Sequence, residues 1–209
     1  MRSLITIIVL VSLLVGCESK QSPKPPSAQP QQAADNAIGV LQKLVNEQNY
    51  RSFGFDSVDE VKQAQLSQPL AVMNIPLDAL KGYQAGTDPQ SLLVKTSETI
   101  YPVTVNGQVK SSVTIVHTET GYAPSSFGNA PIVKALSQYR QLTNAQSEFV
   151  VRVPALNLYF LGRTVEGKTM IVPIAEDPRM KLRPGEPVPF EAALPDLVAA
   201  ANAYNGLPM

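Results

Sequence analysis

The pair Asn106-Gly107 lies between two runs rich in β-branched residues, and it limits the fold of this chain more than any other feature. The first run covers residues 92–105, and the second covers residues 109–118. A two-residue type I′ turn needs a positive φ at both central positions, which asparagine and glycine adopt at low cost. We therefore expect a long antiparallel hairpin that turns at Asn106 and Gly107.

A second hairpin is expected nearer the C-terminus. Its strands cover residues 149–163 and 168–174, and the chain turns around residues 165–168, where a glycine is present. Residues 70–77 predict one further strand. Residues 121–129 contain glycine, proline, serine and asparagine and indicate a loop.

The spacing of apolar residues predicts four helices, in which these residues recur three and four positions apart. The expected helices begin at Asp35 or Asn36, at Val58 (as far as about Gln65), at Pro131, and at Glu191 (as far as Tyr204). Ser57 and Glu60 have the spacing of a capping box before the second helix. Hairpins with helices between them predict an α+β fold, with a mainly antiparallel sheet built from two long hairpins and helices packed against it.

Composition excludes several classes of function. The chain has 17 Lys and Arg against 17 Asp and Glu, so it offers no broad positive surface for nucleic acid. One cysteine cannot form an internal disulfide, and one histidine cannot build a histidine-rich metal site. The sequence contains no phosphate-binding loop and no calcium-loop pattern, so we expect no cofactor.

The N-terminal residues have the form of a processing signal. Arg2 precedes an apolar run at residues 4–14, which as a helix would span about half of a ~30 Å hydrocarbon core. The run is therefore too short for a transmembrane helix and has the length of a signal-peptide core. It ends in Leu14-Val15-Gly16-Cys17, which resembles the lipobox of bacterial lipoproteins.

The lipobox resemblance implies that Cys17 receives a diacylglyceryl group, with palmitate-type acyl chains, and that residues 1–16 are removed as a lipoprotein signal peptide. The membrane would then be one partner, contacted through the lipidated Cys17. Glu18 follows the cysteine where an aspartate would favour the inner membrane. The expected location is thus the outer membrane facing the periplasm in a Gram-negative cell, or the outer face of the cell membrane otherwise.

The residues after Cys17 predict a tether and then one domain. Residues 18–34 are rich in Pro, Gln and Ser and contain no large apolar side chain, a composition that cannot form a core. We expect residues 17–34 to form the lipidated cysteine and its tether. Residues 35–209 are then expected to form a single globular domain.

Catalytic residues are sparse in this sequence. His117 lies two residues before Glu119, which could orient it as a base, and serines occur at 111–112 and 125–126. No glycine pattern of a nucleophile elbow surrounds these serines. A His117-centred hydrolase site is therefore the weaker interpretation, and an exposed or structurally satisfied histidine is the stronger one.

Two features suggest binding. Arg179, Lys181 and Arg183 alternate and would place three cations on one side of an extended segment, either for an anion or as a solvated loop. Residues 122–129 and 151–160 place aromatic and aliphatic groups next to turns, where they would line a groove or pack in the core.

The sequence thus predicts a membrane-anchored envelope lipoprotein that acts as a non-catalytic binding or accessory module for a protein or another envelope component. The alternative is a lipid-anchored periplasmic hydrolase with a site assembled around His117. Catalytic, cofactor-binding and metal-ligating residues are not assigned. Cys17 is the single residue to which the sequence assigns a site role.

Overall fold

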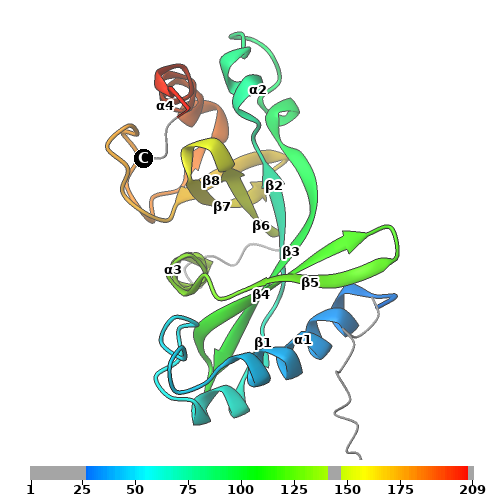
Figure 1. The fold of residues 1–209 in the computed structure, drawn as a ribbon. Helices are drawn as coiled ribbons and strands as arrows, with labels where there is room; N and C mark the ends of the chain where they lie inside the picture. The colour runs from blue at the N-terminus through cyan, green and yellow to red at the C-terminus, as the bar shows by residue number, and fades with distance from the viewer. Residues whose placement is uncertain (1–26, 141–146, 207–209) are drawn as a thin grey trace, which may run out of the picture.

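The computed structural model describes residues 27–140 and 147–206, and these residues form one mixed sheet covered by helices on both faces (Figure 1). The strands are β1 (Gln65–Leu66), β2 (Leu70–Asn74), β3 (Val94–Val105), β4 (Gln108–Thr118), β5 (Gly121–Phe127), β6 (Glu148–Val153), β7 (Leu158–Val165), β8 (Lys168–Pro173) and β9 (Val188–Pro189). The α-helices are α1 (Pro30–Leu44), α2 (Leu77–Lys81), α3 (Ala130–Arg140) and α4 (Phe190–Ala203), and the 3-10 helices are η1 (Asp59–Gln63), η2 (Pro89–Leu92) and η3 (Pro154–Leu156).

The sheet has the order β5-β4-β3-β2-β6-β7-β8-β9, and β1 also pairs with β3. Among the described strand pairs only β2 and β6 run parallel, so the predicted α+β fold with a mainly antiparallel sheet is confirmed. Two long hairpins describe only part of this sheet, because β1, β2, β5 and β9 lie outside both predicted hairpins and the second hairpin contains two strands, β6 and β7, where one was expected. The description of the sheet as two hairpins is therefore not confirmed.

Alternate residues along the strands face different helices, as the pleat of a sheet requires. One face packs against α3 through Leu70, Val72, Val150, Leu161 and Val172. On the other face, residues such as Tyr101 and Val113 pack with α1. Residues such as Val151 and Ile171 pack with α4. Helices α1 and α4 therefore cover opposite ends of one face, and α3 covers the middle of the other (Figure 1).

Both predicted turns occur where the sequence places them. Asn106 and Gly107 have φ values of 50° and 76°, and they join β3 to β4. Glu166 and Gly167 have φ values of 50° and 77°, and they join β7 to β8. In each pair the glycine occupies a backbone region that other residues enter at a cost.

The predicted first strand of the second hairpin, residues 149–163, is wrong as a single element. The chain leaves β6 at Val153, makes the 3-10 turn η3, and returns as β7 from Leu158. Pro154 opens this turn, and Asn157 closes it with a φ of 53°. Both residue types favour such a reversal, so β6 and β7 form an antiparallel pair of their own.

The predicted loop at residues 121–129 is also wrong, because Gly121–Phe127 forms strand β5 along β4. The register between these strands shifts next to Pro124, which accommodates a residue without an N–H group. The glycine, proline and serine content indicated a loop, whereas pairing with a long neighbouring strand determines the structure.

The expected boundary between tether and domain at residue 35 is wrong. Helix α1 begins at Pro30, and Ala33 and Ala34 are buried against the sheet. Ser27 already exchanges two backbone hydrogen bonds with Tyr122 on β5. Alanine is a strong helix former and small enough for close packing, so this polar-looking segment contributes to the core.

The other predicted elements are close to their observed positions. The second helix is the shorter 3-10 helix η1, and its expected capping box forms only in part. Ser57 accepts the Glu60 N–H, but Glu60 accepts the N–H of Asp56, at 2.7 Å, rather than that of Ser57. Strand β2 ends at Asn74, ahead of the short helix α2. No helix within residues 27–140 and 147–206 is long and apolar enough to cross a membrane.

Candidate binding groove

One hollow lies on the face of the sheet that α3 covers, and a second lies next to it at the edge of β7 beyond the end of β8, where side chains from both faces of the sheet meet. Both are lined by Ile132 of α3 and Tyr159 of β7, so these two residues mark where the hollows meet. Polar or charged residues predominate in the lining of one hollow, which has a volume of about 270 Å³, and aliphatic or aromatic residues predominate in the lining of the other, of about 310 Å³. Polar atoms supply nearly half of the exposed surface in both. We call them the polar part and the apolar part of the α3 groove.

Hydroxyl groups from two neighbouring strands line the polar part. Ser112 and Thr114 come from β4, and Ser125 and Ser126 come from β5. Ser112 donates a hydrogen bond to the Gly128 carbonyl at 2.6 Å, and Ser125 donates to the Thr114 carbonyl at 3.3 Å. A hydroxyl that has donated its proton can still accept, so these side chains present acceptors to a ligand.

Arg152 provides the positive charge of the polar part. Its Nε donates to the Asn74 side-chain oxygen at 2.9 Å, and its Nη2 lies 2.9 Å from a Glu98 carboxylate oxygen. The parallel pairing of β2 and β6 aligns Asn74 with Arg152 and thereby fixes the guanidinium group. Glu98 compensates its charge, and the remaining N–H groups can donate to a ligand carbonyl.

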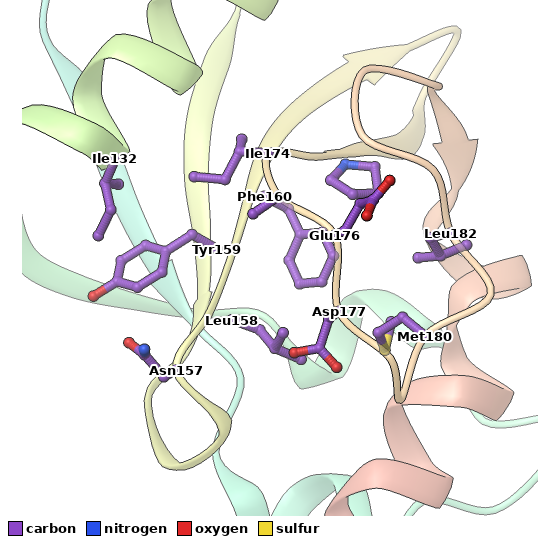
Figure 2. A pocket seen from close by; sticks show the side chains of 12 residues that line it. Ile132, Asn157, Leu158, Tyr159, Phe160, Ile174, Glu176, Asp177, Met180 and Leu182 are labelled. Atoms are coloured by element: carbon purple, nitrogen blue, oxygen red, sulfur yellow. The ribbon is translucent and has the colours of Figure 1, made fainter. Parts of the chain in front are cut away.

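The apolar part lies between β7, helix α3 and the segment that follows β8 (Figure 2). Its lining residues are Ile132, Asn157, Leu158, Tyr159, Phe160, Pro173, Ile174, Ala175, Glu176, Asp177, Met180 and Leu182. Two of these residues are acidic, and none is lysine, arginine or histidine. The charged side chains among those that line the apolar part are thus both carboxylates.

Residues 174–187, which we call the strap, form one wall of the apolar part. Asp177 accepts hydrogen bonds from the Arg179 guanidinium, which also donates to the Leu156 carbonyl at 2.9 Å. The Gly185 N–H donates to the Pro173 carbonyl, and a Cβ at Gly185 would lie 2.6 Å from the Tyr139 ring of α3. The strap is therefore tied both to the sheet and to α3.

The ion pair within the strap predicts a pH-dependent contribution to stability. Hydrogen bonds from Arg179 hold the pKa of the Asp177 carboxyl below its usual value of 3.8. A carboxyl with a lowered folded-state pKa stabilises the fold above its unfolded-state pKa of about 4, and this contribution is lost as the pH falls through the lowered value. Asp177→Asn should therefore reduce the free energy of unfolding by about 1 kcal/mol near pH 7.

Urea unfolding of the wild type and of Asp177→Asn between about pH 7 and about pH 2 measures this contribution. The difference between the two proteins should narrow towards acid pH. Asp59→Asn is the matched control: Lys62 likewise lowers the pKa of Asp59, but both side chains are exposed, so this variant should unfold like the wild type. A difference for Asp177→Asn that stays constant with pH would refute this role of the ion pair.

The structure separates the residues of the hydrolase hypothesis. His117 is exposed near the end of β4, and its described contact is with the Tyr122 ring, 4.6 Å away between centroids. It lines none of the hollows described here. Ser111 is buried on the sheet face opposite the groove, and the Ser112 and Ser125 hydroxyls donate to backbone carbonyls.

The proposed cation row is not a free anion site. Arg179 is engaged by Asp177, and Arg183 lies 3.6 Å from Glu186. Lys181 donates its backbone N–H to Asp196, which fixes this part of the strap. Cys17, the predicted lipid attachment site, lies outside the described residues.

The predicted groove segments contribute to the α3 groove, in part through aromatic and aliphatic side chains of the kind expected: Leu158, Tyr159 and Phe160 line the apolar part. Within 122–129, the residues Ser125, Ser126 and Asn129 line the polar part, and within 151–160, Arg152 and Tyr159 do so. Other large aliphatic residues of the second segment, including Val151 and Val153, are buried in the core instead.

Sequence reasoning missed Glu98 and Ile132 as groove residues, and Asn74 as the residue that holds Arg152. Glu98 and Ile100 alternate along β3, a pattern that puts both on one face, but the sequence does not show which helix covers that face. The pairing of Asn74 with Arg152 joins residues far apart in the chain and leaves no local pattern.

The described residues form no metal site. Within residues 27–140 and 147–206, no group of three or more His, Cys, Asp or Glu side chains is placed to hold a metal ion. Comparison of the chain with protein-family models, with curated proteins and with solved structures finds no match. The function proposed below therefore depends on the groove and on the N-terminal sequence.

Proposed function

We propose that this protein is a bacterial envelope lipoprotein that is anchored through Cys17 and binds a partner in the α3 groove without catalysing a reaction. The observation that carries the binding role is the groove itself: a polar part with fixed donors and acceptors borders an apolar part, and the two share Ile132 and Tyr159. Sites of this kind, mainly apolar with a few placed polar groups, are typical of ligand recognition. The lipobox at residues 14–17 supports the anchor.

The two edges of the sheet favour the groove over strand addition as the binding mode. At one edge, Ser27 already pairs with Tyr122 of β5, and Pro124 has no N–H group to donate. At the other edge, β9 consists of only Val188 and Pro189. Short edges that contain proline protect a sheet from pairing with another chain.

Anchoring would increase the effectiveness of such a site. A domain held at a membrane surface meets partners in the same layer at a high effective concentration. A binding site of low affinity is therefore still occupied to a large extent. The proposed location is the outer membrane facing the periplasm in a Gram-negative cell, or the outer face of the cell membrane otherwise.

The anchor is tested by replacing Cys17 with serine in the full chain. The wild-type protein should fractionate with membranes and yield an N-terminal peptide carrying a diacylglyceryl group on Cys17, because two or more acyl chains give stable membrane attachment. Cys17→Ser should be released from the membrane fraction. An unmodified Cys17 peptide together with a soluble wild-type protein would overturn the anchor. Photo-crosslinking from Tyr159 in the groove tests the binding role.

A further inference from the structure

Glu176 gives the apolar part of the groove a negative charge that the described residues do not compensate. Asp177 is paired with Arg179, but Glu176 has no hydrogen bond or ion pair with any described residue, and it is exposed at the rim. Arg183 lies near it in an adjoining hollow and pairs with Glu186. A hollow lined mostly by aliphatic and aromatic residues, with a carboxylate at its rim that has no described partner, favours a ligand that carries an apolar group next to a positive charge.

The size and lining of the apolar part fit side chains rather than a long acyl chain. Its volume of about 310 Å³ lies at the lower end of the range for small-ligand sites, about 300 to 1,000 Å³. Aromatic and aliphatic groups such as Phe160, Leu158 and Met180 border the space (Figure 2), and each is at least nine-tenths buried in the core that α4 covers. An anionic lipid would also place its charge near Glu176, which opposes it.

The polar part offers what a peptide backbone needs. Each residue of an extended peptide carries one N–H donor and one carbonyl acceptor. Hydroxyls such as those of Ser126 and Thr114 can accept from the N–H groups, and the guanidinium of Arg152 can donate to the carbonyls. Because Glu98 compensates Arg152, this part selects neutral polar groups rather than a free anion.

We propose that the α3 groove binds an extended peptide segment in which an apolar side chain fills the apolar part and an adjacent lysine or arginine meets Glu176. The backbone of the segment lies along the polar part, between helix α3 and strands β4 and β5. This inference rests on the proposed function, because it names the ligand of the same groove.

The test compares two short peptides that differ only in charge. One carries Lys-Leu-Val-Lys between glycine and serine residues, and the other carries Glu-Leu-Val-Glu in the same frame. The lipidated full chain is held in neutral phosphatidylcholine vesicles, so that the membrane does not attract either peptide. The basic peptide should bind about tenfold more tightly than the acidic one.

Glu176→Gln should reduce this preference to about threefold or less, because it removes the charge and keeps the shape of the side chain. Glu119→Gln is the matched control: Glu119 is also exposed, lies in the turn after β4, and lines none of the hollows described here. It should leave the preference unchanged. Urea unfolding of all three proteins should give the same midpoint.

Equal binding of the two peptides, or a preference that Glu176→Gln leaves intact, would overturn the inference. If neither peptide binds while crosslinking from Tyr159 still captures a partner, the inference fails and the proposed function stands. If neither peptide binds and no crosslink forms, both fail.

Discussion

Replacement of Gly54 by alanine should lower the free energy of unfolding by about 3 kcal/mol or more. Gly54 lies in the turn after α1 with a φ of 94°, in a backbone region that disfavours a side chain. A Cβ there would lie 2.1 Å from the Lys110 carbonyl oxygen and 2.5 Å from the Ala130 Cβ. Neither contact can relax cheaply, since one atom belongs to the backbone of β4 and the other begins α3.

Gly86→Ala separates the clash at Gly54 from the backbone effect. Gly86 has nearly the same φ, 92°, but a Cβ there meets no atom within 4 Å. Gly86→Ala should lower the free energy of unfolding by only about 1 kcal/mol. The additional loss in Gly54→Ala then measures how closely the turn packs against β4 and α3. Urea unfolding at equilibrium gives the free energy of unfolding of both variants. A similar loss in the two variants would show that the turn is not packed against β4 and α3 as described.

Leu197→Ala should lower the free energy of unfolding by about 2 to 5 kcal/mol. Leu197 is fully buried on α4, in the core that α4 forms with β6, β7 and β8. Truncation removes its apolar contacts and leaves a cavity that the surrounding strands can only partly fill.

Leu44→Ala is the matched control, because it makes the same chemical change in another helix. Leu44 ends α1, and 43% of its surface is exposed. Its replacement should cost less than about 1 kcal/mol. If Leu197→Ala were as mild as Leu44→Ala, α4 would not be packed on the sheet in the arrangement described.

The parts of the fold that the sequence predicted are those that local chemistry determines. The turns at Asn106-Gly107 and Glu166-Gly167 were predictable because a two-residue turn restricts φ at its own positions. The hydrogen bond from the Glu60 N–H to Ser57 was predictable for the same reason, although Glu60 accepts from Asp56 instead of Ser57 and the segment forms a 3-10 helix. In both cases the determining contacts lie within a few residues.

The parts that the sequence did not predict depend on distant contacts. Strand β5 has the composition of a loop and becomes a strand by pairing with β4. The start of α1 has the composition of a tether, and its alanines become core residues only because the sheet lies beneath them. The parallel pairing of β2 with β6 joins segments on either side of a long hairpin, and no local pattern indicates it.

The groove also depends on contacts between residues that are distant in the sequence, so the sequence predicted it only in part. Its two predicted segments were identified by their aromatic and aliphatic residues, but most of the aliphatic ones are core residues. The residues that shape the groove, including Arg152, Glu98 and Ile132, come together only because α3 crosses the middle of one sheet face. The position of a helix on a sheet therefore had to be known before the groove could be recognised.

In-cell photo-crosslinking from Tyr159 tests the binding role most directly. A photoreactive phenylalanine replaces Tyr159 in the groove of the full chain, and in a second strain it replaces Tyr50, a similarly half-buried tyrosine that lines none of the hollows described here. The proposal predicts a recurrent crosslinked partner from position 159 and none from position 50. Crosslinks of equal yield from both positions, or none from position 159, would contradict it.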